Sequence, residues 1–512
     1  MRAIGFENFR KFKEFPTIQF GDITILVGCN NAGKSTVVKA IVTMLTFLKE
    51  ARFDIMGQEN SVLNTKFYFN KNQYAHIGTF KRALYNGADN EVIKFKAQIE
   101  EIEFEIELKG DSSDEHAVSA SVQRLAITDN RSRIHFEFFF CVNTVKVHLK
   151  KNRDLYEGNE DFEIRARNLD KLKDNIEGNV DEEPFFRSYR ARSFFSQYPV
   201  VLEDEVFSAS ITEICEHHMI GGPLVSGLIY NLSAYFEDLY ENDKEKTNKD
   251  LDNFIRLVPY IGRLRRRIEQ LLLFTPVVEY LYAHSASQVV LYNALNTNDF
   301  LVQTIHNFAN KRFDVYSEPY EFVRFWMSKF KIGTDFIIKS IGGEAHTMDI
   351  IDENGKAMPL ADKGMGSIQI MILLLRLAID VYNKGMGRIQ RNSPVTILVE
   401  EPEQNLHPHF QSLLLDFFYQ VSQKYNIRFV IETHSEYLIR RTQVIVAKKK
   451  FKDVEQLKKE NPFKVYYFPA DCPPYIMQYN INGRFINTFG EGFFDEASSL
   501  ALLLSKMSRK YV

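Results

Sequence analysis

Residues 23–41 read ITILVGCNNAGKSTVVKAI and contain the stretch that decides the fold. Residues 23–28 are a short apolar run typical of a buried strand, and apolar residues recur at helical spacing after Ser35. Between them, GCNNAGKST at 28–36 fits the pattern G-x4-G-K-[ST]. The pattern requires a strand before it and a helix after it, and both are predicted here, so the stretch indicates a phosphate-binding loop.

The chemistry of this loop follows from its position at a helix N-terminus. Backbone N–H groups there have no partner within the helix, and the helix dipole favours anions. We expect Lys34 to bridge two phosphates and Ser35 to bind Mg²⁺. The plain alternative is an ordinary glycine turn. The residues predicted to bind the phosphate group are Asn30, Asn31, Ala32, Gly33, Lys34, Ser35 and Thr36.

A second apolar strand, VTILV at 395–399, is followed by Glu400 and Glu401. A carboxylate at the end of a buried strand that faces a phosphate loop can hold Mg²⁺, and the next can orient and deprotonate an attacking water. We assign the metal role to Glu400 and the role of general base to Glu401. A solvated acidic loop is the alternative interpretation.

His434 follows a third predicted strand, in IETHSEYL at 431–438. A polar side chain at the mouth of that strand can reach the terminal phosphate and respond to its hydrolysis. We therefore count His434, with Glu401 and Lys34, among the catalytic residues. The alternative is a structural histidine.

A second glycine turn, DKGMGSIQ at 362–369, opens a long apolar helix. Gly364, Gly366 and Ser367 would present bare backbone at another helix N-terminus, which suits a phosphate oxygen. Two interpretations stay open. Either the protein holds two nucleotides, or this turn completes the site of a neighbouring subunit.

Changes of pattern divide the chain into four predicted segments. Residues 1–90 hold the phosphate loop, 91–150 alternate with period two as an antiparallel sheet does with one solvated face, and 151–335 form a mostly helical insertion. Within that insertion, 261–282 is the clearest helix. Residues 336–512 alternate strands and helices. The predicted fold class is α/β, a mixed sheet flanked by helices, with an antiparallel arm and a helical insertion between the two glycine turns.

Composition excludes several classes of protein. The 512 residues are 45% hydrophobic and have a net charge of −3, so overall positive charge gives no reason to expect nucleic-acid binding. The four cysteines are spaced too widely for a CxxC metal motif and are too few for a disulfide framework, which favours a reducing cytoplasm. The richest apolar run, 365–380, holds an arginine and is shorter than a membrane-spanning helix needs. We expect a cytoplasmic globular protein without a membrane segment.

In order, GCNNAGKST, DKGMGSIQ, TILVEEPEQNLHPHFQ and IETHSEYLIRR resemble the head of an ABC-type ATPase of the SMC/Rad50/RecF group. The resemblance is to the bacterial branch of OLD-family and PtuA-like anti-phage AAA-family ATPases, and it covers roughly residues 1–100 and 340–440. It implies Walker A at 28–36, a divergent signature at 362–369, Walker B at 396–401, a D-loop around 405–408 and the switch His434. It also implies that Arg10 and Lys11 lie near the nucleotide phosphates.

The sequence departs from the family pattern in several ways. LSGGQ is absent, so Ser367 is expected to supply the hydroxyl that acts across the dimer, and only Gln73 with the HIGTF that follows stands as a Q-loop candidate. The inserted region shows no sustained heptad repeat, so long coiled-coil arms are not expected. No clear Glu…Asp-x-Asp set follows His434, so the chain itself is not expected to be a nuclease.

The resemblance implies a slow ATPase whose cofactors are ATP and Mg²⁺, bound between the heads of a homodimer or higher oligomer. It implies a sensor or regulator in defence against phage, which controls a separate effector such as a nuclease. The alternative is a RecF/Rad50-like repair ATPase that binds DNA. Two basic runs are candidate surfaces for nucleic acid or an acidic partner, although such a run is usually a solvated face: Arg263, Arg265, Arg266 and Arg267, and Lys448, Lys449, Lys450 and Lys452. A scaffold that binds ATP without hydrolysing it is a further alternative.

Overall fold

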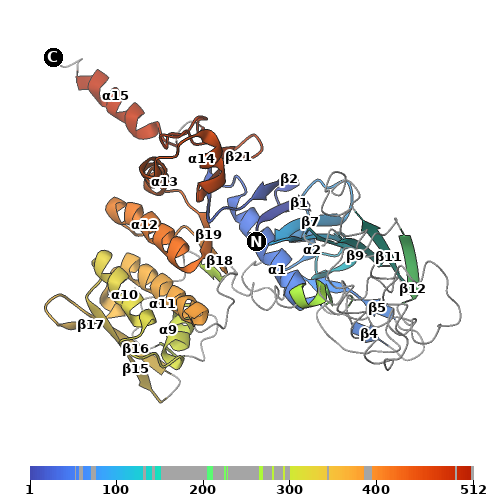
Figure 1. Cartoon of the computed structure of the whole chain (residues 1–512), viewed down its shortest axis with the longest axis horizontal. Coiled ribbons are helices and arrows are strands. Elements are labelled where there is room, and N and C mark those ends of the chain that lie inside the picture. Colours follow the sequence, from blue (N-terminus) through green and yellow to red (C-terminus); the bar gives the residue numbers. More distant parts are fainter. Residues whose placement is uncertain are drawn as a thin grey trace, which may run out of the picture. The chain divides into compact units, whose positions relative to one another are not determined.

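The structure is a computed structural model, and it describes residues 1–51, 54–56, 62–70, 77–130, 134–140, 144–151, 205–210, 224–225, 228, 264–268, 279–281, 292–293, 300–342, 345–385, 395–490 and 493–508. The chain divides into two compact units, each built from two separate stretches of sequence (Figure 1). The first unit comprises Met1–Ile18 and Ala40–Leu273, and the second comprises Gln19–Lys39 and Phe274–Val512.

The first unit contains a nine-stranded sheet in the order β12-β11-β10-β9-β8-β7-β1-β2, with β6 paired to β9. Neighbouring strands from β1 and β7 to β12 run antiparallel. The strands are β1 (Ala3–Phe9), β2 (Phe12–Gln19), β6 (Lys66–Tyr68), β7 (Val92–Ile99), β8 (Ile102–Lys109), β9 (Ser119–Asp129), β10 (Ile134–Phe140), β11 (Thr144–Lys151) and β12 (Glu205–Ser210). A short hairpin of β4 (Asp54–Met56) and β5 (Val62–Asn64) and the helix α2 (Phe80–Ala83) belong to the same unit.

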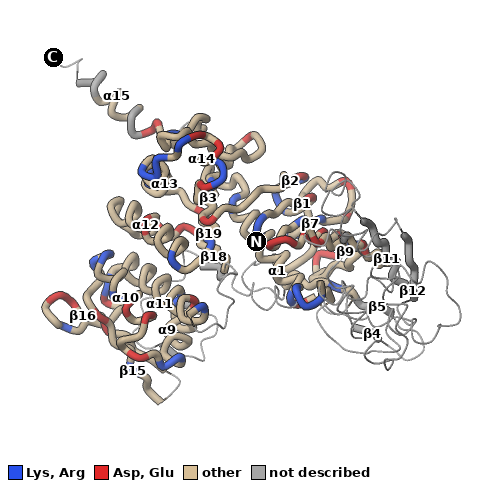
Figure 2. Tube along the Cα trace, viewed as in Figure 1, with Lys and Arg blue, Asp and Glu red and all other residues tan. Residues whose placement is uncertain are grey.

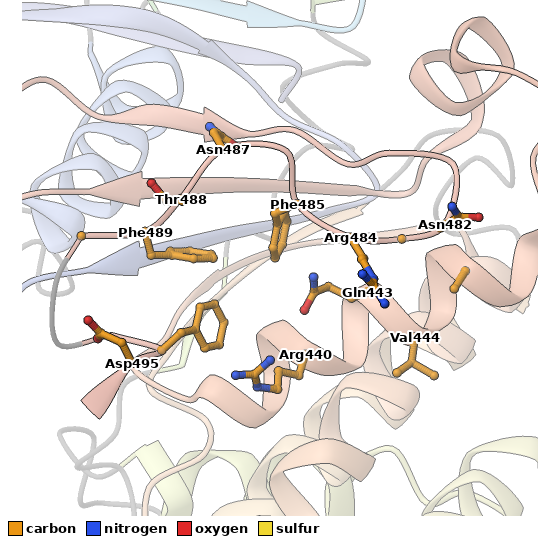
Figure 3. Close-up of a pocket in the computed structure, with 14 residues that line it drawn as sticks. Arg440, Gln443, Val444, Asn482, Arg484, Phe485, Asn487, Thr488, Phe489 and Asp495 are labelled. Carbon is orange, nitrogen blue, oxygen red and sulfur yellow. The ribbon is translucent and has the colours of Figure 1, made fainter. Parts of the chain in front are cut away.

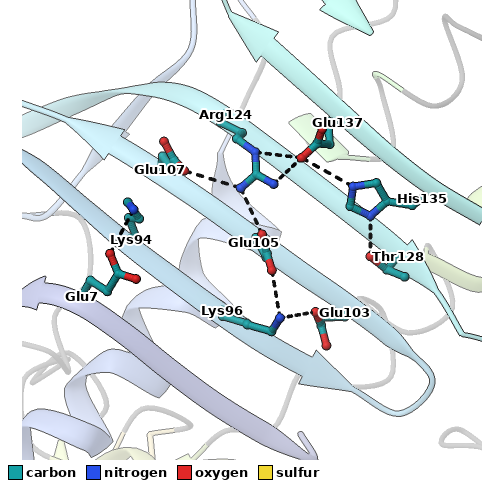
Figure 4. Close-up of polar contacts among 10 residues, drawn as sticks. All are labelled: Glu7, Lys94, Lys96, Glu103, Glu105, Glu107, Arg124, Thr128, His135 and Glu137. Atoms are coloured by element: carbon teal, nitrogen blue, oxygen red, sulfur yellow. Dashed lines mark hydrogen bonds and ion pairs between the residues drawn. The ribbon is translucent and has the colours of Figure 1, made fainter. Parts of the chain in front are cut away.

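One face of this sheet is apolar and the other is charged. Buried and half-buried residues alternate along β7 and β8, as the period-two pattern predicted. On the charged face, Arg124 pairs with Glu105 at 3.0 Å and with Glu137, while Lys96 contacts Glu103 at 2.7 Å (Figure 4). Cross-strand ion pairs of this kind hold neighbouring strands in register.

The second unit is built on a six-stranded sheet in the order β13-β18-β19-β3-β20-β21. All neighbouring pairs are parallel except β20 with β21. The strands are β3 (Ile23–Gly28), β13 (Glu279–Leu281), β18 (Val395–Glu400), β19 (Ile427–Glu432), β20 (Phe463–Phe468) and β21 (Tyr475–Met477). A smaller antiparallel sheet holds β14 (Tyr292–Asn293), β15 (Asp335–Ile341), β16 (Ala345–Ile351) and β17 (Ala357–Pro359).

The described helices that follow β14 in the chain belong to the second unit. They are α9 (Phe300–Asn310), α10 (Glu318–Lys329), α11 (Met365–Gly385), α12 (Pro408–Tyr425), α13 (Glu436–Lys449), α14 (Val454–Glu460) and α15 (Glu496–Ser508), with a 3₁₀ turn at Leu360–Asp362. Helix α1 (Lys34–Glu50) begins in this unit and continues into the first. One hydrophobic core joins the sheet to α9–α13. The predicted α/β class, a mixed sheet flanked by helices, is confirmed.

Helix α11 is longer than its apolar run suggested. Among the described residues it alone is long and apolar enough, by length and composition, to cross a membrane. It nevertheless packs against α9 and α10, and 72% of its most apolar 18-residue stretch is buried inside the protein. The apolar run therefore forms the centre of the core of the second unit.

The structure corrects the interpretation of the middle of the chain. Residues 261–282 are helical only at 264–268 among those described, and Glu279–Leu281 is a strand that pairs in parallel with β18. The helices α9 and α10, which we placed in the insertion, pack in the unit that contains β18 and β19. An apolar run shared by an edge strand and a helix has no periodicity that separates the two, which explains the error.

Candidate functional site

Three parallel strands of the second unit end side by side, and the predicted site residues follow each of them. Glu400 at the end of β18 is in register with Glu432 at the end of β19, and Glu432 is in register with Leu26 of β3. Ligands of open α/β sheets bind outside the carboxyl ends of the strands. The sheet thus brings residues from 28–36, 400–403 and 432–435 to one edge.

The phosphate loop, residues 28–36, begins at a glycine that no other residue can replace without strain. Gly28 has φ of 145°, and a Cβ atom there would lie 2.1 Å from the carbonyl oxygen of Phe468 in β20. The N–H of Cys29 donates to that same oxygen at 2.9 Å. Close approach of β3 to β20 therefore fixes where the loop leaves the sheet.

Lys34 lies folded inside the loop. Its Nζ donates to the carbonyl oxygens of Cys29 at 2.8 Å and Gly28 at 3.2 Å, and the residue is only 3% exposed. Burial lowers the pKa of Lys34, while the carboxylates of Glu432 and Glu401 act in the opposite direction. An ammonium held this way is available to a phosphate oxygen, a stronger acceptor than a carbonyl.

Ser35 has a partner that sequence reasoning missed. Its Oγ donates to Oε1 of Glu432 at 2.9 Å. Burial, and then the negative charge of Glu400, raises the pKa of Glu432 to about 7. The only signal in the sequence was a polar residue directly before Thr433 and His434, at the end of an otherwise apolar strand.

Glu401 is held from several directions. Its backbone lies in the left-handed region at φ of 43°, and its N–H donates to the carbonyl of Glu432 at 2.8 Å. Its Oε2 accepts a hydrogen bond from the side chain of Gln404, and its Oε1 lies 3.5 Å from Nε2 of His434. A non-glycine residue with positive φ is strained, and such strain persists only where its surroundings impose it.

His434 is oriented through its backbone. Its N–H donates at 2.7 Å to Oε1 of Glu403, whose pKa is raised by burial. Burial and then the charge of Lys34 lower the pKa of His434, while Glu401 raises it. The 3.5 Å contact of Glu401 with His434 and the effect of the Lys34 charge on the pKa of His434 bring the three residues that we predicted to be catalytic to the same strand edge.

The second glycine turn packs against Asn405 and Leu406 of the same chain. Gly366 is buried, and a Cβ atom there would lie 2.5 Å from the carbonyl oxygen of Asn405. Gly364 is exposed, and its carbonyl accepts from the N–H groups of Ser367 and Ile368 in the first turn of α11. Of the three residues predicted at this turn, Gly364 and the half-buried Ser367 therefore offer a surface to another molecule, and Gly366 does not.

Two other predicted residues belong to the first unit or lie outside the described part of the chain. Arg10 belongs to the first unit, where its N–H donates to Ala83 at 2.7 Å, and its pKa is lowered by burial and then by Arg82. Gln73 lies outside the described residues. The nucleotide contacts of Arg10 and Gln73 stay predictions.

The basic runs have structural roles. Arg267 pairs with Asp129 at 2.7 Å and Glu101 at 3.1 Å. Lys448 and Lys449 occupy the last turn of α13, where cations favour the helix dipole (Figure 2). The ion pairs of Arg267 weaken the case for a basic docking surface at that residue.

The residues present fit Mg²⁺ bound together with a nucleotide. Mg²⁺ prefers oxygen ligands and is usually held by one or two protein groups, with phosphates and waters completing its shell. Ser35 and Glu400 provide such oxygens at the strand edge, and no group of three or more metal-binding side chains occurs among the described residues. Buried Oε2 of Glu432 has no hydrogen-bond partner, which suits a site completed by a ligand.

A cavity of about 900 Å³ lies between α13 and residues 482–490 and 494–495 (Figure 3). Arg440, Gln443, Phe485 and Phe489 line it, and no residue of the phosphate loop does. It is therefore separate from the strand edge described above.

A glycine-led phosphate loop, a buried lysine, and carboxylates on the neighbouring strands define a P-loop nucleotide-binding protein. The chain belongs to the AAA ATPase domain family, whose sequence profile matches residues 1–439. It is thus an ATP-binding protein of an ATPase family. A comparison with curated proteins finds no match.

Solved structures similar to the chain include SMC head domains. One is the SMC head bound to the C-terminal winged-helix domain of ScpA, with 10% identity, a TM-score of 0.33, and coverage of 93% of this chain and 96% of that one. A Pyrococcus furiosus SMC head with an extended coiled coil, bound to the C-terminal domain of ScpA, shows 9% identity and a TM-score of 0.33 over 98% of this chain and 99% of that one. The Thermotoga maritima SMC head shows 9% identity and a TM-score of 0.31 over 94% and 100%.

Proposed function

We propose that the protein hydrolyses ATP and uses the bound triphosphate to join two copies of itself. The observation that carries this proposal is the coupling of Lys34, Glu401 and His434 at the carboxyl end of the parallel sheet. Each residue has the chemistry of a distinct role. The ammonium of Lys34 can bind phosphate oxygens, the carboxylate of Glu401 can accept a proton from water, and the imidazole of His434 lies beside the carboxylate.

In the proposed reaction, Glu401 accepts a proton from the water that attacks the terminal phosphate. Gln404 and His434 hold the carboxylate in place, so little reorganisation is needed when the proton moves. Lys34 leaves the carbonyls of Gly28 and Cys29 and neutralises charge on the phosphate oxygens. Bound Mg²⁺ would be held by Ser35 and Glu400 and would neutralise further charge.

The proposed dimer follows from the second glycine turn. Gly366 faces its own chain, but Gly364 is open and Ser367 is half-buried. Ser367 and Gly364 would contact the nucleotide of a second copy, because bare backbone at a helix N-terminus favours a phosphate. ATP would then hold both copies, and hydrolysis would release them.

We further propose the setting implied by the sequence resemblance: a cytoplasmic sensor or regulator of anti-phage defence that controls a separate effector such as a nuclease. That proposal is supported by the order of motifs alone. The alternative, a repair ATPase that binds DNA, predicts a salt-sensitive, ATP-dependent gel shift.

The test of the proposed switch is the mass in solution of Glu401→Gln with ATP. Gln removes the base but keeps the shape, so ATP should accumulate and the mass should double or rise further. Lys34→Ala serves as the matched control, since it should remain in the form seen without nucleotide. A mass for Glu401→Gln that does not change with ATP, while ATP is bound, would refute the dimer.

A further inference from the structure

We propose that Glu432 is a positioning residue for Mg²⁺: it orients the Ser35 hydroxyl toward the cation and accepts a hydrogen bond from a water of the cation. This inference rests on the proposed function, and it adds a carboxylate that is not among the site residues predicted from the sequence. It is argued from three observations: a hydrogen bond, a buried oxygen without a partner, and a strand register.

The first observation is the direction of the Ser35 hydrogen bond. Ser35 Oγ lies 2.9 Å from Oε1 of Glu432. A serine hydroxyl has one proton and two lone pairs, and a metal is bound through a lone pair. With its proton directed to Glu432, the Ser35 oxygen keeps its lone pairs for a cation. Partners of this kind orient metal ligands in many sites.

The second observation is the other oxygen of the same carboxylate. Glu432 is 4% exposed, and its Oε2 is buried with no hydrogen-bond partner. Leaving a buried acceptor unsatisfied is costly, so native structures seldom keep one without a reason. A Mg²⁺-bound water is a donor that would satisfy this oxygen.

The third observation is the position of Glu432 beside Glu400. The two are register partners at the ends of adjacent parallel strands, so their side chains leave the same face of the sheet. Two carboxylates at one level repel each other, which raises the pKa of Glu432, and a divalent cation near both would relieve that repulsion. The geometry therefore favours a cation at the edge where Ser35 also lies.

A purely structural role predicts something different. A side chain that only closes the end of β19 would be satisfied by its own protein, as Asp416 is by Arg441 at 2.7 Å. Glu432 instead makes one hydrogen bond to the phosphate loop and leaves its second oxygen without one. This difference makes Asp416→Asn a matched control, because it removes a partly buried carboxylate of the same unit away from the strand edge.

The experiment measures the binding of a fluorescent ATP analogue to the full chain, first in EDTA and then across a Mg²⁺ titration. Glu432→Gln can still accept from Ser35 through its amide oxygen but carries no charge. We expect its affinity in EDTA to match wild type and its half-saturating Mg²⁺ concentration to rise roughly 10- to 100-fold. Asp416→Asn should match wild type in both measurements.

The double variant Ser35→Ala with Glu432→Gln distinguishes positioning from an independent effect. If Glu432 acts mainly through Ser35, the half-saturating Mg²⁺ concentration of the double variant should be little higher than that of Ser35→Ala alone. Thermal unfolding checks that each variant folds. If Glu432→Gln does not fold, Glu432→Asp takes its place. Asp keeps the charge but is one methylene shorter, so we expect a smaller rise in the half-saturating Mg²⁺ concentration.

Two failures are distinguishable. A folded Glu432 variant with the Mg²⁺ dependence of wild type would overturn the inference while leaving the ATPase proposal intact. Wild type that binds the analogue neither in EDTA nor with Mg²⁺ would instead refute the proposed function.

Discussion

The carboxylate of Glu401 and the imidazole of His434 lie 3.5 Å apart, although they follow different strands. Residues 401–406 fold back as a turn, with the N–H of Gln404 donating to Glu401 and that of Leu406 to Glu403. Glu403 in turn accepts from the backbone N–H of His434. One tight turn thus places the predicted base and fixes the loop that holds the histidine.

The contacts of Lys34 predict a large effect of its removal. Lys34→Ala should weaken ATP binding roughly 10- to 100-fold, because a charge-assisted contact contributes about 1.5–3 kcal/mol. Isothermal titration calorimetry would measure this loss. Lys448→Ala, which removes an ammonium from the end of α13, should bind as wild type does; an equal loss in both would indicate a general charge effect.

Cys29 gives a chemical test of the loop. It is half-buried, and its Sγ lies 3.8 Å from the hydroxyl of Tyr467. Alkylation with N-ethylmaleimide should abolish ATP binding, because the added group would fill the space above the loop, and ATP should slow the reaction. Modification is read by mass spectrometry. Cys29→Ser should bind ATP before and after treatment, even though the exposed Cys472 still reacts; its inactivation would point to another thiol.

Gly483 should be essential to stability but not to nucleotide binding. It has φ of 76°, and a Cβ there would lie 2.2 Å from the carbonyl of Gln443 in α13. Gly483→Ala should therefore lower the free energy of unfolding by about 2 kcal/mol or more, seen as a lower melting temperature. Gly355→Ala is the matched control, since Gly355 has the same φ but nothing within 4 Å. Equal losses would assign the effect to backbone strain instead of contact.

Asp380 predicts a pH dependence of stability. It is fully buried in α11 and neither oxygen has a hydrogen-bond partner; burial raises its pKa to about 6, against the opposing charges of Arg376 and Lys384. The folded state therefore holds a proton that the unfolded state releases near pH 4. This stabilisation is present at low pH and is lost as the pH rises through 6.

Replacing that carboxyl should flatten the profile. Between pH 4.5 and 7.5, wild type should lose roughly 2 kcal/mol that Asp380→Asn does not lose. Melting temperatures across this range compare the two. Parallel profiles would show that Asp380 does not titrate in the folded protein.

The sequence predicted the parts of the fold that carry local signals. The strand before Gly28, the helix from Lys34, and the strands that end in Glu400 and Glu432 all match the structure, because buried parallel strands read as apolar runs with clear boundaries. Glu279–Leu281 was misassigned, since three residues paired to a distant strand have no signature of their own.

The site was predictable only in part, for a related reason. Lys34, Glu401 and His434 each follow a recognisable strand. The contact of Ser35 with Glu432 depends on which strands become neighbours, and the sequence does not state that β19 lies beside β3. Gly366 looked open from its lack of a side chain, but tertiary packing against Asn405 covers it.

The central claim is that Glu401 activates water for hydrolysis of bound ATP. Phosphate release and ATP affinity, measured on wild type and Glu401→Gln in the same preparation, test it most directly. We predict equal affinity and a turnover reduced by roughly 10²- to 10⁴-fold in the variant. Equal turnover in both proteins, with ATP bound by each, would contradict the account.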